Sequence, residues 1–561
     1  MRYHSYPAAL LNVENPMQPG TFRPRDSYAK GATTHSLIDQ TIGANFSSTV
    51  ARFAEHEALV ERSSGRRWTY AELDAEVDAV ALGLLALGVT TGDRVGIWAP
   101  NCAEWVLVQY ATAKIGALLV NINPAYRTHE LAFVARQSGL RTLVAVSEFK
   151  GSSYADMIDA IRHDCPALHD VVLIGAESWN DLMRAGRHGD PAQLDAIGAG
   201  LEPDDPINIQ YTSGTTGFPK GATLSHRNIL NNGFFVGELI HYSENDRICI
   251  PVPFYHCFGM VMGNLAATSH GATMVIPAPA FDPRLTLAAV AEEHCTSLYG
   301  VPTMFIAMLN DPSFDESDLS SLRTGIMAGS PCPAETMKQV IERMGAHEIC
   351  ICYGMTETSP VSMQTRLDDS FEVRVSTVGS VHQHLEIKMI DTETGEVLPR
   401  GEIGEFCTRG YSVMLGYWDQ PDKTAETIDD EGWMHTGDLA MMDAAGNVSI
   451  TGRITDLVLR GGENIYPREI EEFLLTHPDV LDVQVIGVPD RKYGEELMAW
   501  VRMKPDTTSL DAATVKSFSA GRLAHYKIPR YVHIVDEFPM TVTGKIRKVE
   551  MRETALGLLG L

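Results

Sequence analysis

Residues 211–226 read YTSGTTGFPKGATLSH, and this stretch decides how the rest of the chain is interpreted. Just before and into it, Ile207, Ile209 and Tyr211 alternate with polar residues, which is the period of a β-strand. The chain then continues as a loop in which glycines are interleaved with hydroxyl side chains and a lysine. Glycine lets backbone N–H groups turn toward one point, while the hydroxyls and the lysine add donors and positive charge. The pattern predicts a polyphosphate-binding loop. Its predicted members are Thr212, Ser213, Gly214, Thr215, Thr216, Gly217 and Lys220.

The spacing of this loop excludes the commonest phosphate-binding motif. A Walker A loop follows the pattern G-x-x-x-x-G-K-[ST]. Here Gly217 follows Gly214 after only two residues, and Lys220 lies between Pro219 and Gly221. The alternative interpretation is a flexible surface turn, but such turns rarely combine several hydroxyls with a lysine. We therefore expect a phosphate-binding loop of a different type.

The composition excludes several classes of protein. At 561 residues the chain exceeds a single hydrophobic core, so two or more domains are expected. A net charge of −27 makes nucleic acid and anionic membrane surfaces poor partners. The nine cysteines lack the paired spacing of a zinc site, and we interpret Cys350 and Cys352 as core thiols in a reducing compartment. No apolar window has the length of a membrane span or a signal peptide, so we expect a soluble, cytoplasmic protein.

The string TSGTTGFPKG resembles the signature loop of the adenylate-forming (ANL) superfamily, which includes acyl-CoA synthetases, luciferases and the adenylation domains of peptide synthetases. In those enzymes the loop contacts the β- and γ-phosphates of ATP. The resemblance extends from about residue 40 to 550, with five motifs in the order of the family.

This resemblance implies an α/β fold in two unequal parts. A large N-terminal domain would consist of packed α/β sheets with a β-barrel-like subdomain, and a small, mobile α+β domain would follow. We place an N-terminal tail at residues 1–35, the large AMP-binding domain at 36–454 and the small domain at 455–561.

An aromatic segment follows the phosphate loop, at residues 251–263, PVPFYHCFGMVMG. A histidine among apolar residues is usually part of the core. In the adenylate-forming enzymes, however, an aromatic–His–aromatic–Gly element lines the acyl pocket and moves as a gate. The resemblance therefore makes His256 a catalytic-site residue. The predicted pocket residues are Phe254, Tyr255, His256 and Phe258.

Two further segments resemble nucleotide-binding elements of the family. AGSPCP at 328–333 resembles the adenine-contacting turn, which implicates Gly329, Ser330 and Pro331 in ATP binding. YGMTE at 353–357 resembles the second signature, in which Tyr353 and Gly354 bind ATP and Thr356 donates to the α-phosphate. Glu357 supplies a hard oxygen ligand that suits Mg²⁺. By itself this segment could equally be a strand end with a solvated glutamate.

The predicted ribose-binding residues and the predicted domain hinge come next along the chain. Asp438, in WMHTGD, matches the family's ribose-binding aspartate, and Arg453 would reach ribose or phosphate. In relatives the hinge lies two residues after this arginine and is usually Asp or Lys. Here the position is Thr455, which departs from that pattern but can still absorb a backbone rotation.

The small domain carries two predicted functional elements. Gly461 and Gly462 match the glycine loop that passes beside coenzyme A in the family. Lys545 lies in a basic run, where a lysine is usually just solvated. By resemblance it enters the active site and bridges the substrate carboxylate and the α-phosphate, which offsets the charge of one anion attacking another.

We conclude that the sequence predicts a fatty acyl-CoA synthetase that uses ATP, Mg²⁺ and coenzyme A, with a medium- or long-chain acid as substrate. It would first form an acyl-adenylate and pyrophosphate, then rotate its small domain and transfer the acyl group to coenzyme A. Two alternatives remain open: transfer to a carrier-protein thiol, or a catalytically silent nucleotide-binding protein on this fold. The oligomeric state is left open, with a homo-oligomer allowed.

Overall fold

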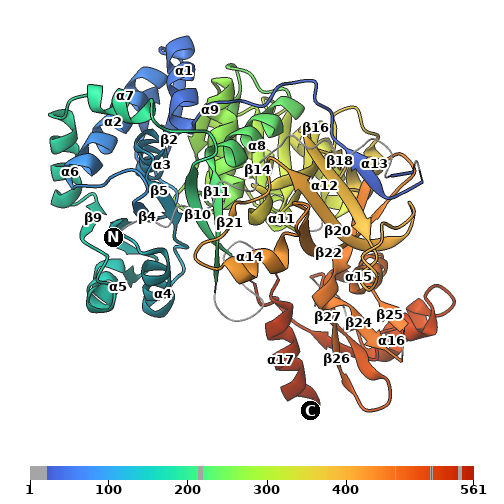
Figure 1. The fold of residues 1–561 in the computed structure, drawn as a ribbon. Helices are drawn as coiled ribbons and strands as arrows, with labels where there is room; N and C mark the ends of the chain where they lie inside the picture. The colour runs from blue at the N-terminus through green and yellow to red at the C-terminus, as the bar shows by residue number, and fades with distance from the viewer. Residues whose placement is uncertain are drawn as a thin grey trace.

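The computed structural model describes residues 22–23, 25–212, 219–330, 332–461, 463–505, 507, 510–540 and 546–561. Two large sheets, an antiparallel sheet and a smaller C-terminal sheet account for most strands of this part of the chain. Figure 1 shows the C-terminal elements in orange and red, below the larger body formed by the rest of the chain.

The first large sheet has seven strands and carries the predicted phosphate loop. Its order is β21 (Gly416–Tyr417), β11 (Lys220–Ser225), β10 (Pro206–Thr212), β5 (Leu118–Asn121), β4 (Arg94–Trp98), β6 (Thr142–Val146) and β9 (Asp170–Ile174). The strands from β10 to β9 are parallel, so their carboxyl ends lie at one edge. Ligands of open α/β sheets bind at that edge.

The second large sheet has nine strands and is parallel through its centre. Its order is β18 (Ser380–Val381), β17 (Val361–Gln364), β16 (Glu348–Gly354), β15 (Thr324–Ala328), β14 (Ser297–Gly300), β12 (Arg247–Cys249), β13 (Thr273–Ile276), β2 (Glu57–Glu61) and β3 (Arg66–Thr69). The parallel strands are almost entirely buried, which explains their continuous apolar sequences.

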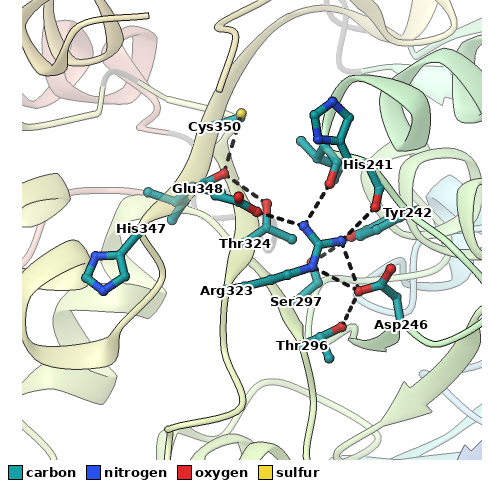
Figure 2. Close-up of polar contacts among 12 residues, drawn as sticks. His241, Tyr242, Asp246, Thr296, Ser297, Arg323, Thr324, His347, Glu348 and Cys350 are labelled. Atoms are coloured by element: carbon teal, nitrogen blue, oxygen red, sulfur yellow. Dashed lines mark hydrogen bonds and ion pairs between the residues drawn. The ribbon is translucent and has the colours of Figure 1, made fainter. Parts of the chain in front are cut away.

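An arginine fixes the amino-terminal ends of these central strands. Arg323, just before β15, donates to the carbonyls of Ile240 and His241 at 3.0 and 2.9 Å. It also contacts the carboxylates of Asp246 at 3.0 Å and Glu348 at 2.8 Å (Figure 2). This network lies at the edge of the sheet opposite to the carboxyl ends, and sequence reasoning missed it.

Helices cover both sheets and join them into one core. A single apolar cluster includes residues of both sheets and of the helices between them. The helices of this body are α1 (Ile42–Phe53), α2 (Tyr70–Ala86), α3 (Ala103–Ile115), α4 (Thr128–Ser138), α5 (Tyr154–Ile161), α6 (Glu177–Arg187), α7 (Ala192–Gly198), α8 (His226–Leu239), the π-helix η2 (Phe258–Leu265), α9 (Ala266–His270), α10 (Pro283–Glu293), α11 (Pro302–Leu309), α12 (Ala334–Met344), α13 (Phe371–Ser376) and α14 (Pro421–Thr427).

The predicted barrel-like subdomain takes the form of a five-stranded antiparallel sheet. Its order is β1 (Tyr28–Lys30), β19 (Leu385–Ile390), β20 (Ile403–Gly410), β22 (Met434–Met442) and β23 (Val448–Arg453). Part of the predicted N-terminal tail therefore belongs to a sheet, because β1 pairs with β19.

The C-terminal part has its own sheet and its own apolar clusters. Its strands are β24 (Val458–Arg460), β25 (Glu463–Ile465), β26 (Val480–Asp490), β27 (Gly494–Met503) and β28 (Tyr531–Ile534), and its helices are α15 (Pro467–Leu475), α16 (Ala512–Ser519) and α17 (Lys548–Leu559). The predicted α/β fold with a small α+β domain is confirmed. The boundary at 454/455 stays a prediction.

Several local predictions are also confirmed. Thr69 caps α2 through a capping box with Glu72, and Pro467 begins α15. Cys350 and Cys352 are buried free thiols, as are most of the other cysteines. Among the described residues, no helix is both long enough and apolar enough to cross a membrane.

Candidate functional site

The phosphate loop connects two antiparallel strands. Thr212 at the end of β10 pairs with Lys220 at the start of β11, so both ends of the loop lie at the carboxyl edge of the seven-stranded sheet. Ser213, Gly214, Thr215, Thr216 and Gly217 lie outside the described residues. The predicted strand before the loop is confirmed, and the phosphate contacts of the loop stay a prediction.

A buried carboxylate lies beside the loop. Glu357 is 5% exposed, and its Oε1 accepts hydrogen bonds from the hydroxyls of Thr212 at 3.3 Å and Tyr417 at 2.9 Å. The Lys220 ammonium lies 4.9 Å from the centre of the Tyr417 ring. Burial, reinforced by Glu357, raises the pKa of the Tyr417 hydroxyl, which therefore stays a donor. The structure thus brings together Thr212, Lys220 and Glu357, all predicted from the sequence.

Tyr417 is the member of this cluster that sequence reasoning missed. It reaches the site because β21 pairs with β11, with Ala222 opposite Tyr417. β21 is only two residues long, and the pairing joins segments about 190 residues apart. A Gly–Tyr pair carries no signal for such a pairing, so only the folded structure could reveal it.

A second polar cluster lies where the nine-stranded sheet meets the antiparallel sheet. The Tyr353 hydroxyl donates to Asp438 Oδ2 at 2.7 Å, and Arg453 Nε donates to Asp438 Oδ1 at 3.0 Å. Asp438 and Arg453 are opposite each other on β22 and β23. Asp438 raises the pKa of Arg453, and burial raises the pKa of Tyr353, so the Arg453 guanidinium keeps its charge and the Tyr353 hydroxyl keeps its proton. The predicted adenine- and ribose-side residues therefore lie in contact.

The adjacent glycines fit tight backbone positions. Gly329, after β15, has φ of +92°, a conformation that favours glycine. A Cβ on Gly354 would lie 1.8 Å from the Pro360 carbonyl oxygen, which leaves no room for a side chain. Ser330 is exposed next to Gly329, and Pro331 lies outside the described residues. Glycine is therefore required at Gly329 by the backbone conformation and at Gly354 by the close approach of the Pro360 carbonyl.

The aromatic segment leads into the π-helix η2. π-Helices are rare, and those that occur are often found at functional sites. Phe258 stacks on Tyr299 of β14 with 5.6 Å between ring centres, and the Tyr299 hydroxyl donates to the Met262 carbonyl at 2.9 Å. His256 is half-buried, and its Nδ1 accepts from the Phe258 amide at 3.2 Å.

The other two predicted pocket residues, Phe254 and Tyr255, contact residues of the hydrophobic core and its strands. Phe254 is fully buried at 5.7 Å from the Trp105 ring, and Tyr255 accepts a hydrogen bond from Asn121 through its carbonyl at 3.1 Å. The acyl-pocket role of all four residues stays a prediction.

Next to the predicted hinge, contacts form both within the small domain and between it and the larger body. Thr455 lies in a single 3-10 turn, η5 (Ile454–Asp456). Arg552 of α17 donates to the Thr455 carbonyl at 3.4 Å and forms an ion pair with Asp456 at 3.0 Å. Arg468 of α15 donates to the Ile450 carbonyl of β23 at 2.7 Å.

The predicted coenzyme A loop is a hairpin turn between β24 and β25. Gly461 has φ of +63° and donates its amide to the Tyr493 carbonyl at 2.7 Å. Gly462 and Lys545 lie outside the described residues. The roles of these three residues therefore stay predictions.

Comparison with known proteins identifies the family. The sequence profile of the AMP-binding enzymes matches residues 46–418, and that of the AMP-binding enzyme C-terminal domain matches residues 469–545. This chain belongs to the AMP-binding enzymes. The predicted membership of the adenylate-forming superfamily is thereby confirmed.

Similar AMP-binding enzymes cover nearly the whole chain. Putative acyl-CoA synthetase YngI of Bacillus subtilis (strain 168) is 47% identical over 544 residues, which cover 94% of this chain and 99% of YngI. The mitochondrial medium-chain acyl-CoA ligase ACSF2 of Danio rerio is 44% identical over 577 residues, which cover 99% of this chain and 95% of ACSF2.

A solved structure shares the architecture of this AMP-binding enzyme. ATP-bound MatB from Rhodopseudomonas palustris superposes with a TM-score of 0.84 at 32% identity, covering 92% of this chain and 99% of MatB. The anthranilate CoA ligase AuaEII, in complex with anthranoyl-AMP, gives a TM-score of 0.83 at 28% identity, covering 93% of this chain and 99% of AuaEII.

Proposed function

We propose that this chain is an ATP-dependent acyl-CoA ligase that converts a carboxylic acid, ATP and coenzyme A into acyl-CoA, AMP and pyrophosphate. The observation that carries the proposal is a pair of polar clusters built from residues at or just after the carboxyl end of β16: Glu357 with Thr212 and Tyr417, and Tyr353 with Asp438 and Arg453. The acyl-CoA ligases among its relatives support the same reaction.

In this proposal ATP spans the two clusters. Asp438 accepts hydrogen bonds from the ribose hydroxyls, and Tyr353 lies beside the adenine. The phosphates extend toward Thr212 and Lys220, where the loop wraps them. This direction places the α-phosphate near Thr356 and Glu357, which follow β16 directly.

Glu357 fits a role in binding Mg²⁺. Its carboxylate is a hard oxygen ligand, and both hydroxyls bond to the same oxygen, Oε1, which leaves Oε2 outside this pair of bonds. The ion, when bound with ATP, neutralises charge on the phosphates. Thr212 and Tyr417 hold the carboxylate in one orientation.

The reaction proceeds in two displacements. A carboxylate oxygen of the acid attacks the α-phosphorus, the bond to the bridging oxygen breaks, and pyrophosphate leaves. Lys545 and Thr356 stabilise the charge that develops at this step. The small domain then rotates about Thr455 and brings Gly461 and Gly462 beside coenzyme A. The thiolate attacks the acyl carbon, and AMP leaves.

We infer a medium-chain fatty acid as substrate, because ACSF2 is a medium-chain acyl-CoA ligase and matches nearly the whole chain. The test measures pyrophosphate release and thioester formation for acids from acetate to palmitate and for aryl acids, each with and without coenzyme A. A rate of thioester formation that is highest between hexanoate and dodecanoate would support the assignment. A rate that is highest with acetate or an aryl acid would refute the proposed medium-chain substrate.

The same panel separates the second candidate function. An enzyme that transfers its acyl group to a carrier protein would release pyrophosphate without forming a thioester to coenzyme A. Silence with every acid would instead favour a non-catalytic nucleotide-binding protein.

A further inference from the structure

The strand that carries Asp438 is irregular where it approaches the site. β20 and β22 pair with a register shift between Glu405 and Cys407 of β20, opposite the segment from His435 to Leu439. Such bulges often occur near functional sites, because they change the direction of a side chain. Gly437, immediately before Asp438, has φ of +70°. On the β20 side the ladder therefore leaves the residues from Thr436 to Asp438 without a paired residue, and on the other side Asp438 is paired with Arg453 of β23.

One carboxylate holds this irregular segment from both sides. Glu405 Oε1 accepts the amide of Gly437 at 3.1 Å, and Glu405 Oε2 contacts Nδ1 of His435 at 3.0 Å. The Glu405 side chain is only 12% exposed, so these bonds are largely shielded from water.

Two further contacts complete the network around Glu405. Nε2 of His435 lies 3.6 Å from Asp429, so the imidazole lies between two carboxylates. Thr436 donates to the Phe406 carbonyl at 2.7 Å and accepts the Asp438 amide at 3.1 Å. Every residue from His435 to Asp438 is thus tied either to β20 or to its own neighbour.

We propose that Glu405 is a positioning residue for the nucleotide site: it fixes Gly437 and His435 so that Asp438 presents its carboxylate to the ribose hydroxyls. The inference rests on the proposed function in one respect, the role of Asp438 in ribose binding. Glu405 itself contacts no nucleotide in this proposal. It acts through the backbone and imidazole of the segment that carries Asp438.

The network also contains a titratable group. His435 is faced by Glu405 and Cys407 of β20 and by Asp429 from the turn after α14, with Lys388 of β19 near Cys407. Glu405 and Asp429 raise the pKa of His435 above its ordinary value. The cationic imidazole therefore holds both carboxylates at low pH, and these contacts weaken as the pH rises through the folded-state pKa.

The test measures the affinity of the full-length protein for ATP and for 2′,3′-dideoxy-ATP by calorimetry, which requires no acid substrate. We expect Glu405→Ala to weaken ATP binding about tenfold, the size of one hydrogen bond to a charged group. Binding of the dideoxy nucleotide should change less than about twofold, because that ligand has no ribose hydroxyls for Asp438 to bind. Glu405→Gln, which can still accept the Gly437 amide, should recover most of the loss.

A matched control is available in the same sheet. Glu386 on β19 also makes two bonds, to the Tyr28 hydroxyl at 2.7 Å and to Arg409 at 2.9 Å, but it is not linked to Asp438. Glu386→Ala should lower the melting temperature and leave the affinity for both nucleotides unchanged. Equal losses for ATP and dideoxy-ATP in Glu405→Ala, or no loss for either, would overturn the proposal.

The pH profile gives an independent readout that does not need the alanine variant to fold. In the wild type, the dissociation constant of ATP should rise as His435 loses its proton. In Glu405→Gln the midpoint of this rise should move to lower pH, because one of the two flanking charges is removed. A midpoint that does not move would contradict the role proposed for Glu405. So would a metal ion bound one to one by the wild-type protein and lost in Glu405→Gln, because Glu405 would then be a metal ligand together with Cys407 and His435. If nucleotide binds as expected but no acid gives pyrophosphate, the proposed function fails and this inference does not.

Discussion

The two ends of the candidate nucleotide site are built in different ways. At the ribose end, Asp438 already has a charged partner and a hydroxyl partner, Arg453 and Tyr353, each within 3.0 Å. At the phosphate end, Glu357 is held by two neutral hydroxyls, and within the part of the chain that the structure describes Lys220 lies over the face of Tyr417 rather than on a carboxylate. The contrast suggests that the ribose end is organised before ATP binds, whereas the phosphate end keeps charge available for its ligands.

The largest expected effect concerns the phosphate end. Lys545→Ala should lower the rate of pyrophosphate release by roughly 100- to 1,000-fold, because it removes a positive charge from the transition state of adenylation. Thioester formation from preformed acyl-adenylate should fall far less. Lys548→Ala is the control, since Lys548 forms an ion pair with Glu471 at 2.7 Å within the small domain. If Lys545→Ala slowed both steps equally, the role assigned to Lys545 would be wrong.

The next effect tests whether the ribose end is organised in advance. Asp438→Ala leaves Arg453 and Tyr353 without their common partner, and we expect a loss of roughly 10- to 100-fold in ATP affinity. Calorimetry measures it. Asp443→Ala, at the turn of the same β22–β23 hairpin, removes two hydrogen bonds from backbone amides and should affect only stability. An Asp438 variant that binds ATP normally would remove the ribose end from the site.

A smaller effect is expected from the residue that the sequence did not reveal. Tyr417→Phe keeps the ring under Lys220 but removes a hydrogen bond to Glu357, so the Mg²⁺ concentration for half-maximal pyrophosphate release should rise about three- to tenfold. Tyr154→Phe, which removes a hydrogen bond to the Pro124 carbonyl, serves as the control. An unchanged Mg²⁺ requirement would show that Tyr417 does not support Glu357.

The smallest effect concerns the contact between α17 and the hinge. The Arg552–Asp456 pair is partly exposed, with side-chain exposures of 28% and 21%, and such pairs contribute little. We expect Arg552→Ala to change the rate of the overall reaction no more than about threefold while ATP affinity stays constant. Stopped-flow measurement of the two half-reactions would locate the change. A loss of ATP affinity would mean that the small domain is coupled to the nucleotide in this orientation.

The parts of the structure that could be predicted depend on short-range signals. The strand before the phosphate loop, the capping box at Thr69 and the proline that begins α15 each follow from neighbouring residues. The grouping of Thr212 with Glu357 and of Tyr353 with Asp438 followed from resemblance to a family, and the structure brings these residues into contact.

The parts that could not be predicted depend on strand pairing between distant segments. Tyr417 and Glu405 reach the site only through β21 pairing with β11 and through the shifted register of β20 and β22. A shift of one residue would turn either side chain to the other face of its sheet, and no local pattern encodes that choice. Arg323 is similar, because its partners come from two distant segments, the connection between α8 and β12 and the start of β16.

The pairing of β1 with β19 has a consequence for synthesis of the protein. The Tyr28 hydroxyl bonds to Glu386, 358 residues further along the chain. Ribosomes add about 5 to 20 residues per second, so the first strand waits roughly 20 to 70 s for its partner to be made. During that time its backbone donors and acceptors remain open to other strands. β1 therefore cannot complete the antiparallel sheet next to the nucleotide site until β19, made much later than β1, has been synthesised.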